Sequence, residues 1–213
     1  YEISLGLVGS EMCIRDRTYT IQSHDLPSAR GLGEPLSAKL NPPAGAHFVG
    51  VVCKENSNQF LLSSNYGYGF ICDFESATSR SKAGKVTLNV PSGSLALPPV
   101  SITKIKDTFI AAITSSGYML VVSAADLPQL TKGKGNKIIN IPSKQLKEEG
   151  ERVAHIAAIS PKDELIIYCK NKHKKLNFND LSLYLSGRAK RGKKLPRGYQ
   201  AVIKTVVNAK ISE

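Results

Sequence analysis

Tryptophan is absent from these 213 residues, and cysteine and histidine are scarce, with four of each. The cysteines, Cys13, Cys53, Cys72 and Cys169, are 40, 19 and 97 residues apart, so no two have the spacing of a zinc knuckle. The histidines are equally scattered. We therefore expect no metal site and no disulfide scaffold, and this pattern is typical of the reducing cytoplasm.

Long hydrophobic runs are also missing. The longest, such as residues 109–113, reach about five residues, whereas a helix that crosses a bilayer needs roughly 20. A hydrophobic content of 41% is typical of a folded, soluble domain. We expect no membrane insertion.

Motifs of the common enzyme classes are missing as well. The Gly31-Leu-Gly33 and Gly133-Lys-Gly135 segments lack the following Gly-Lys-Ser/Thr of a phosphate-binding loop. No Gly-x-Ser-x-Gly elbow occurs, and the sparse acidic residues form no evident pair. The sequence therefore predicts no catalytic residue in this chain.

Positive charge is what the sequence has in excess. It holds 29 Lys and Arg against 17 Asp and Glu, a net charge of +12. Residues 169–197 carry ten basic residues and one acidic residue, so most of the surplus lies there. This excess favours a polyanionic partner, nucleic acid first and an anionic membrane surface second.

A repeat runs through the chain. Short basic-glycine turns occur at residues 28–33, 81–85, 131–135 and 189–194, and their aligned glycines (Gly33, Gly84, Gly135 and Gly192) are 51, 51 and 57 residues apart. Three other markers keep the period: Asp-Leu-Pro at 25–27 and 126–128, Gly-Tyr at 67–68 and 117–118, and Asn-x-Pro at 89–91 and 140–142. Such a period predicts a stack of similar structural units.

Each unit has the pattern of a β-hairpin. The predicted hairpins pair 59–62 with 68–74, 109–114 with 118–123, and 164–170 with 174–178. Units of about 50 residues with four strands each predict an all-β, propeller-like fold of three to four blades. We expect helix only at 143–149 and 179–185, the second with Asn179 at its start and Gly187 just past its end.

If every turn occupies the same place on its blade, the basic side chains line one rim and bind the phosphates of duplex DNA without reading its sequence. The predicted DNA-binding residues are Arg30, Lys82, Lys85, Lys132, Lys134, Lys137, Arg188, Lys190, Arg191, Lys193, Lys194 and Arg197. The alternative is that these residues only make the surface soluble. Tyr184 and Tyr199, beside the densest patch, either stack on unpaired bases or belong to the core.

Several segments resemble the C-terminal domain of the A subunit of bacterial DNA topoisomerase IV. They are Tyr19-Thr-Ile21 with residues 26–36, residues 66–70, the closing Arg191-Gly-Lys-Lys-Leu-Pro-Arg-Gly198 and, most specifically, Asp126-Leu-Pro-Gln-Leu-Thr-Lys-Gly-Lys-Gly-Asn-Lys-Ile-Ile-Asn-Ile-Pro142. The resemblance implies a β-pinwheel, a propeller-like partial ring whose neighbouring blades exchange strands and whose basic edge bends duplex DNA. It also implies a role in capturing duplex segments for decatenation and supercoil relaxation.

The resemblance places the rest of the enzyme outside this chain. The cleavage tyrosine, the use of ATP and Mg²⁺, and the contacts with the B subunit of topoisomerase IV and with a second A subunit are implied to lie elsewhere, in a cytoplasmic, nucleoid-associated enzyme. The A subunit of gyrase is the close relative, but its Gln-Arg-Gly-containing box does not occur here. A propeller-like module that binds an acidic protein is the alternative from another class.

Domain boundaries follow from the same segments. Residues 1–17 resemble a translated sequencing-adaptor tail, and we expect them to be non-native; the alternative is a genuine edge strand. The pinwheel is expected to span residues 18–207, with 208–213 as a tail.

Overall fold

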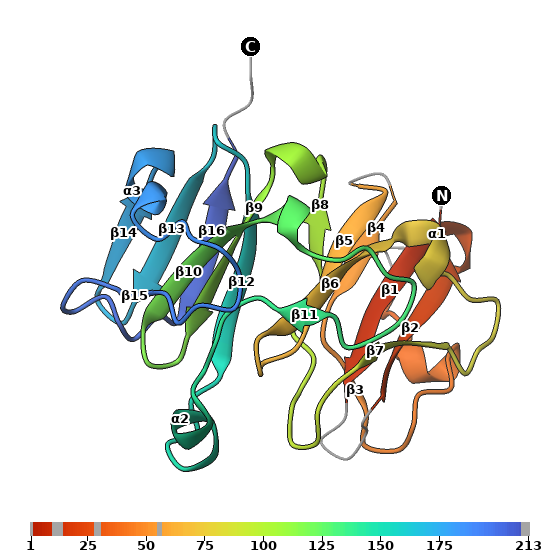
Figure 1. The fold of residues 1–213 in the computed structure, drawn as a ribbon. Helices are drawn as coiled ribbons and strands as arrows, with labels where there is room; N and C mark the ends of the chain where they lie inside the picture. The colour runs from red at the N-terminus through yellow and green to blue at the C-terminus, as the bar shows by residue number, and fades with distance from the viewer. Residues whose placement is uncertain (1, 10–14, 28–30, 55–56, 210–213) are drawn as a thin grey trace. The chain divides into compact units, whose positions relative to one another are not determined.

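The chain is described by a computed structural model, which covers residues 2–9, 15–27, 31–54 and 57–209. Antiparallel strands make up most of its regular secondary structure (Figure 1). The chain divides into two compact units. Unit 1 comprises residues 1–64, 70–103 and 129–135, and unit 2 comprises 65–69, 104–128 and 136–213.

The first sheet lies in unit 1 and has five strands. Strand β1 (Glu2–Gly9) pairs with β2 (Arg15–Gln22), β3 (His47–Phe48) and β4 (Val51–Cys53), and β2 pairs with β7 (Lys85–Asn89). The expected boundary at Thr18 therefore falls inside β2. The assignment of residues 1–17 to a non-native tail stays a prediction.

The second sheet has the order β11-β6-β5-β8. Its strands are β5 (Gln59–Ser63), β6 (Tyr68–Asp73), β8 (Val100–Ile102) and β11 (Asn136–Lys137). β11 pairs with Tyr68 and Gly69, and all four of these residues belong to unit 2. The short helix α1 (Phe74–Ala77) follows β6.

Unit 2 contains the other two sheets. One has the order β12-β9-β10-β15 and the other the order β14-β13-β16. Their strands are β9 (Phe109–Thr114), β10 (Tyr118–Ser123), β12 (Val153–Ile159), β13 (Glu164–Cys169), β14 (Lys172–Leu176), β15 (Lys193–Lys194) and β16 (Lys204–Asn208). The strand pattern predicted for 109–123 is confirmed residue for residue.

Helical segments are short. They are α2 (Ser143–Lys147), α3 (Phe178–Ser182) and the 3-10 turns Ser23–Asp25, Leu36–Ala38, Ile105–Asp107 and Ala124–Asp126. The cap predicted for the second helix is wrong: Asn177, not Asn179, accepts from the Asp180 amide in a reciprocal capping box. Gly187 lies beyond the helix and outside the left-handed region. No helix among the described residues is long and apolar enough to cross a membrane.

Each unit has its own apolar core. In unit 2, Ile113, Met119, Val121 and Leu165 are almost completely buried in one cluster. In unit 1, Phe60, Phe70 and Phe74 belong to a second cluster, and the rings of Phe60 and Phe74 meet edge to face. Strand β10 is buried on both faces, and its sequence is therefore an unbroken apolar run instead of an alternating pattern.

The repeat appears in the structure as equivalent backbone bridges. In unit 1, Gln129 bridges Ile71 and Gly133 bridges Leu88; in unit 2, Leu185 bridges Val121 and Lys190 bridges Ile139. All four bridges are parallel. Each bridging residue of unit 2 lies 50 to 57 residues after its counterpart in unit 1. We call residues 129–135 and 184–195 the exchange segments, because each leaves its own hairpin and pairs along another strand.

The turn glycines are required by backbone geometry. Gly33, Gly84, Gly135 and Gly192 have φ of 76°, 68°, 75° and 80°, which side chains rarely adopt. A Cβ on Gly192 would lie 2.3 Å from the carbonyl oxygen of Met119. The glycine spacing in the sequence therefore marks four turns that share a left-handed backbone at the glycine.

Replacing Gly192 with Ala should lower the free energy of unfolding by more than about 1 kcal/mol, since it adds both left-handed strain and a backbone clash. Gly187→Ala is the matched control, because that Cβ meets nothing within 4 Å. Urea denaturation measures the free energy of unfolding of both variants. Equal stability of the two variants would contradict the packing described for Gly192.

A buried carboxyl predicts a pH dependence. Asp16 is 1% exposed, neither of its oxygens has a partner among the described residues, and burial raises its pKa from 3.8 to about 7. The folded protein keeps a proton that the unfolded chain releases, so stability falls as pH rises between these values. Asp16→Asn should remove this fall and raise stability near pH 8 in urea denaturation, whereas Asp126→Asn, at an exposed position, should leave the fall unchanged.

Candidate nucleic-acid interface

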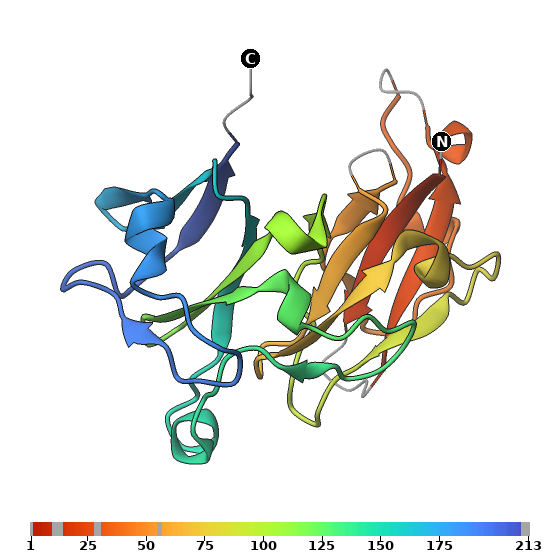
Figure 2. The same cartoon turned by 45° about the horizontal axis from the view of Figure 1, so that its top comes forward.

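The exchange segment of unit 2 is fixed at both ends to β10. The Val121 amide donates to the Tyr184 carbonyl, and the Ser186 amide donates to Val121. Further along, Lys193 pairs with Met119, and the Leu195 amide donates to Gly117. Strand β15 lies beside the start of β10 in both views (Figure 1, Figure 2).

Between these ends the segment contacts residues 138–140, which follow β11. The Ala189 amide donates to the Ile138 carbonyl, and the Asn140 amide donates to the Lys190 carbonyl. Both donor–acceptor distances are 2.8 Å. The backbone is thus held at six residues, 184, 186, 189, 190, 193 and 195. Arg188, Lys190 and Lys193 are exposed and make no side-chain hydrogen bond or ion pair with any described residue, so they are available to a ligand.

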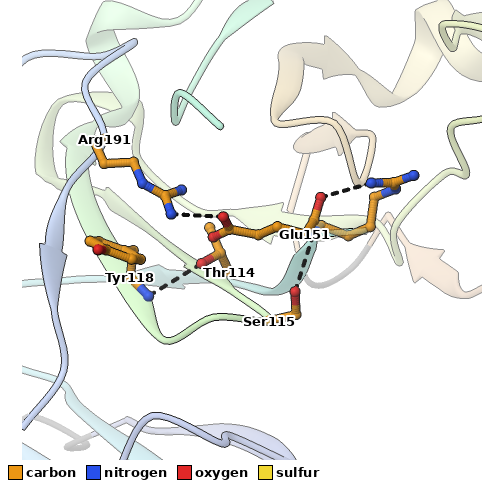
Figure 3. Close-up of polar contacts among 6 residues, drawn as sticks. Thr114, Ser115, Tyr118, Glu151 and Arg191 are labelled. Atoms are coloured by element: carbon orange, nitrogen blue, oxygen red, sulfur yellow. Dashed lines mark hydrogen bonds and ion pairs between the residues drawn. The ribbon is translucent and has the colours of Figure 1, made fainter. Parts of the chain in front are cut away.

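Arg191 differs from its neighbours because its charge is used inside the protein. Its guanidinium donates to Glu151 Oε2 at 2.7 Å, and Glu151 is 1% exposed. The same guanidinium lies 3.8 Å from the centre of the Tyr118 ring. Figure 3 shows Arg191 directed at Glu151, with the Tyr118 ring beside it. Arg191 therefore anchors the turn, and its charge is already neutralised.

Two further cations stack at equivalent positions. Lys137 Nζ lies 5.6 Å from the centre of the Tyr68 ring, and Lys194 Nζ lies 5.6 Å from that of Tyr118. Lys137 also donates to Asn140 Oδ1 at 2.8 Å. Cation–π contacts of this kind hold the short strands β11 and β15 against the ends of the hairpins.

In unit 1 the basic residues lie along β7. Gly133 is hydrogen bonded on both sides to this strand, through the Thr87 carbonyl and the Asn89 amide. Lys132 and Lys134 flank Gly133 and are exposed, as is Lys82 just before the strand. Lys85 is exposed too, but its Nζ donates to the Ser76 carbonyl at 2.6 Å.

The predicted DNA-binding residues therefore fall into distinct groups. Arg30 lies outside the described residues. Lys137, Arg191 and Lys194 make internal contacts, Lys85 is bonded to a carbonyl, and Lys134 is exposed but has an interaction within the protein. The most accessible are Lys82, Lys132, Arg188, Lys190, Lys193 and Arg197. The single continuous rim stays a prediction.

Sequence patterns did not reveal Glu151 or the tyrosines that hold the cations. Gly-Tyr stands out only as a repeat marker, and nothing local distinguishes Glu151 from the preceding exposed Glu148 and Glu149. Its partner is 40 residues away in sequence, so only the fold reveals the pair.

The two tyrosines that were candidates for base stacking make contacts within the protein. Tyr184 is 8% exposed within the core of unit 2, where burial first and the nearby Asp180 carboxylate second raise its pKa. Tyr199 has Lys172 Nζ 4.5 Å from its ring centre. Among the described residues, no group of three or more His, Cys, Asp or Glu side chains could hold a metal ion.

No family model matches the chain. It is 39% identical over 192 residues to the A subunit of DNA topoisomerase 4 from Pseudomonas aeruginosa, covering 90% of this chain and 26% of that protein. It is 38% identical over 193 residues to the protein of the same name from Escherichia coli K12, covering 91% and 25%. The chain thus spans about a quarter of the length of these curated relatives.

Solved structures agree with these relatives. The E. coli ParC C-terminal domain has a TM-score of 0.82 and 35% identity, covering 98% of this chain and 82% of that one. A DNA gyrase A C-terminal domain has a TM-score of 0.70 at 14% identity, covering 98% and 66%, which is a likeness of fold. The predicted all-β pinwheel with propeller-like blades is confirmed.

Removing the charge of Arg191 leaves Glu151 buried without a partner. Arg191→Gln should therefore lower the free energy of unfolding by about 3 kcal/mol, as expected for breaking a buried ion pair. Arg188→Gln, three residues away and exposed, should change it by less than about 0.5 kcal/mol. Chemical denaturation compares them, and a small effect at both positions would contradict the anchoring role of Arg191.

Proposed function

This chain belongs to the family of ParC C-terminal domains, which are part of the A subunit of topoisomerase IV, and from that premise we propose that it binds duplex DNA through its exchange segments and bends it. The observation that carries the proposal is the arrangement at residues 188–193. There the backbone is held to β10 and to residues 138–140, one basic side chain is neutralised internally, and the neighbouring ones are exposed.

A fixed backbone matters for binding because the cations need little ordering when DNA arrives. The ordering of flexible side chains and loops costs part of the interaction energy, and the hydrogen bonds to β10 and to residues 138–140 have already fixed the loop. The exposed lysines and arginines are then directed outward at neighbouring positions, which suits a series of phosphates.

Contacts of this kind do not read bases. Phosphate contacts position DNA without sequence information, and each one releases counterions, so affinity falls steeply with salt. Bending 20–30 base pairs costs on the order of 1–6 kcal/mol, which several phosphate contacts can offset. We therefore expect tolerance of sequence and strong dependence on ionic strength.

The domain would serve a larger enzyme. We infer that it helps to capture duplex segments for decatenation and supercoil relaxation by a topoisomerase IV that uses ATP and Mg²⁺ outside these residues. Its partners there would be the B subunit of that enzyme and a second A subunit, in the cytoplasm at the nucleoid. The higher identity to the ParC domain supports this role over DNA wrapping by gyrase.

Charge reversal of the free cations tests the proposal. The triple variant Arg188→Glu, Lys190→Glu, Lys193→Glu should weaken duplex affinity at least about tenfold and reduce the salt slope by about 3, at roughly 0.9 per lost phosphate contact. Fluorescence anisotropy with two duplexes of unrelated sequence measures both, and the loss should be the same for each.

A matched control carries the same change of charge elsewhere. Lys144→Glu, Lys147→Glu and Lys162→Glu alter exposed lysines on and beyond α2, outside the exchange segments. This variant should keep most of its affinity and its slope. If both triple variants lose affinity equally, the net charge of the chain, and not the exchange segment, is responsible.

A further inference from the structure

Glu151 is a buried charge beside the turn that is proposed to bind DNA. It is 1% exposed, and among the described residues Asp16 is the only other acidic side chain buried to this extent. Neither oxygen of Asp16 has a partner there, whereas Glu151 Oε2 accepts from the Arg191 guanidinium at 2.7 Å. A carboxylate at this depth does not reach a ligand. Any contribution of Glu151 to binding must therefore act through Arg191.

Local structure places this carboxylate. The Glu151 amide donates to the Gln145 carbonyl at 2.9 Å, and Gly150, just before it, has φ of 68°. The next residue, Arg152, is bonded twice to Ser115 in the turn between β9 and β10. Its amide donates to Ser115 Oγ at 3.2 Å, and its carbonyl accepts from the Ser115 amide at 2.8 Å. Glu151 is thus fixed between α2 and this hairpin by bonds that do not involve Arg191.

The preceding repeat forms its turn without such a carboxylate. Val153 pairs with one hairpin as Ala96 pairs with the preceding one. Two residues earlier in the chain, Ser94 therefore stands in the place of Glu151. The turn at 131–135 is nevertheless followed by β11, which pairs with the hairpin strand β6. The fold of the turn does not require a buried carboxylate.

A buried ion pair that the fold does not require needs another explanation. Replacing such a pair by apolar residues is often neutral for stability, so the pair alone is weak evidence of a stabilising role. Here Arg191 lies in the chain between Lys190 and Lys193, which are exposed. The guanidinium is held by the carboxylate and by the Tyr118 ring, whose centre is 3.8 Å away. The backbone between the two exposed lysines is thereby kept in place.

We propose that Glu151 is a positioning residue for DNA binding, which fixes Arg191 and through it the directions in which Lys190 and Lys193 project. This inference rests on the proposed function, since it concerns the same exchange segment. A fixed turn lowers the cost of ordering the side chains when a phosphate arrives. Without the carboxylate, the Arg191 charge has no counter-charge in the protein, and the turn at residues 190–192 loosens.

Net charge alone gives the opposite expectation, so the two can be told apart. Glu151→Gln keeps the shape of the side chain and raises the net charge of +12 by one, which by itself should tighten binding to DNA. We expect instead that the affinity for duplex DNA falls by about threefold or more, because the ordering cost returns. Fluorescence anisotropy over a range of salt concentrations measures the affinity and its salt slope, and the slope should not become steeper.

Control variants separate positioning from charge and from stability. Glu148→Gln makes the same charge change at an exposed site and should keep the affinity or raise it slightly. Phe60→Leu weakens the apolar core of unit 1 and should leave the affinity unchanged while circular dichroism shows a folded chain. Tyr118→Leu removes the ring without changing the charge, so it should weaken binding as Glu151→Gln does. This variant also tests the proposal if Glu151→Gln does not fold.

Hydrogen exchange of the chain without DNA gives an independent readout. The Ala189 and Asn140 amides make the two bonds between the turn and residues 138–140. Both should exchange at least about fivefold faster in Glu151→Gln, and at the original rate in Glu148→Gln. If the unchanged chain binds no duplex, the proposed function is wrong, but these rates still decide whether Glu151 fixes the segment.

Two results would overturn the proposal. One is tighter binding by Glu151→Gln with a salt slope steeper by about 0.9, because the released Arg191 would then contact a phosphate itself. The other is an unchanged affinity in a chain that binds DNA, or unchanged exchange rates in one that does not.

Discussion

The hydrogen bonds between each exchange segment and the edge of a hairpin are the constraint on which the rest of the structure depends. At β10 they run from Tyr184 and Ser186, which bracket Val121, to Lys193 and Leu195 at the start of the strand. A segment held in this way must turn sharply, and only glycine fits the left-handed turn against the Met119 carbonyl. Gly84, Gly135 and Gly192, 51 and 57 residues apart, mark this constraint in the sequence.

The same constraint sorts the basic residues. Those that face the hairpin, such as Arg191 and Lys194, stack on Tyr118, and Arg191 is also neutralised by Glu151. Those that face away, such as Lys190 and Lys193, keep their charge exposed. In a dense run of positive charge, one part thus holds the turn in place and the other part stays exposed at the surface. Net charge alone does not separate the two.

Elements governed by local pattern could be predicted from the sequence. The 109–123 hairpin follows from apolar runs on either side of Ser-Ser-Gly, and the four turn glycines follow from their spacing. The Glu151–Arg191 pair could not, because a contact across 40 residues has no local signature. The cap of α3 was misplaced because Asn177 and Asn179 are both good caps, and only the reciprocal bond with Asp180 decides between them.

If the exposed cations of the exchange segments bind the DNA backbone, the affinity for DNA must fall as salt increases. The most direct test is a salt titration of the affinity of the whole chain for a short duplex, with circular dichroism to show that the protein is folded throughout. We expect a log–log slope of affinity against salt that is steeper than about −3 and equal for unrelated sequences, because several phosphates are neutralised at once. A folded chain whose affinity for DNA does not change with salt would contradict it.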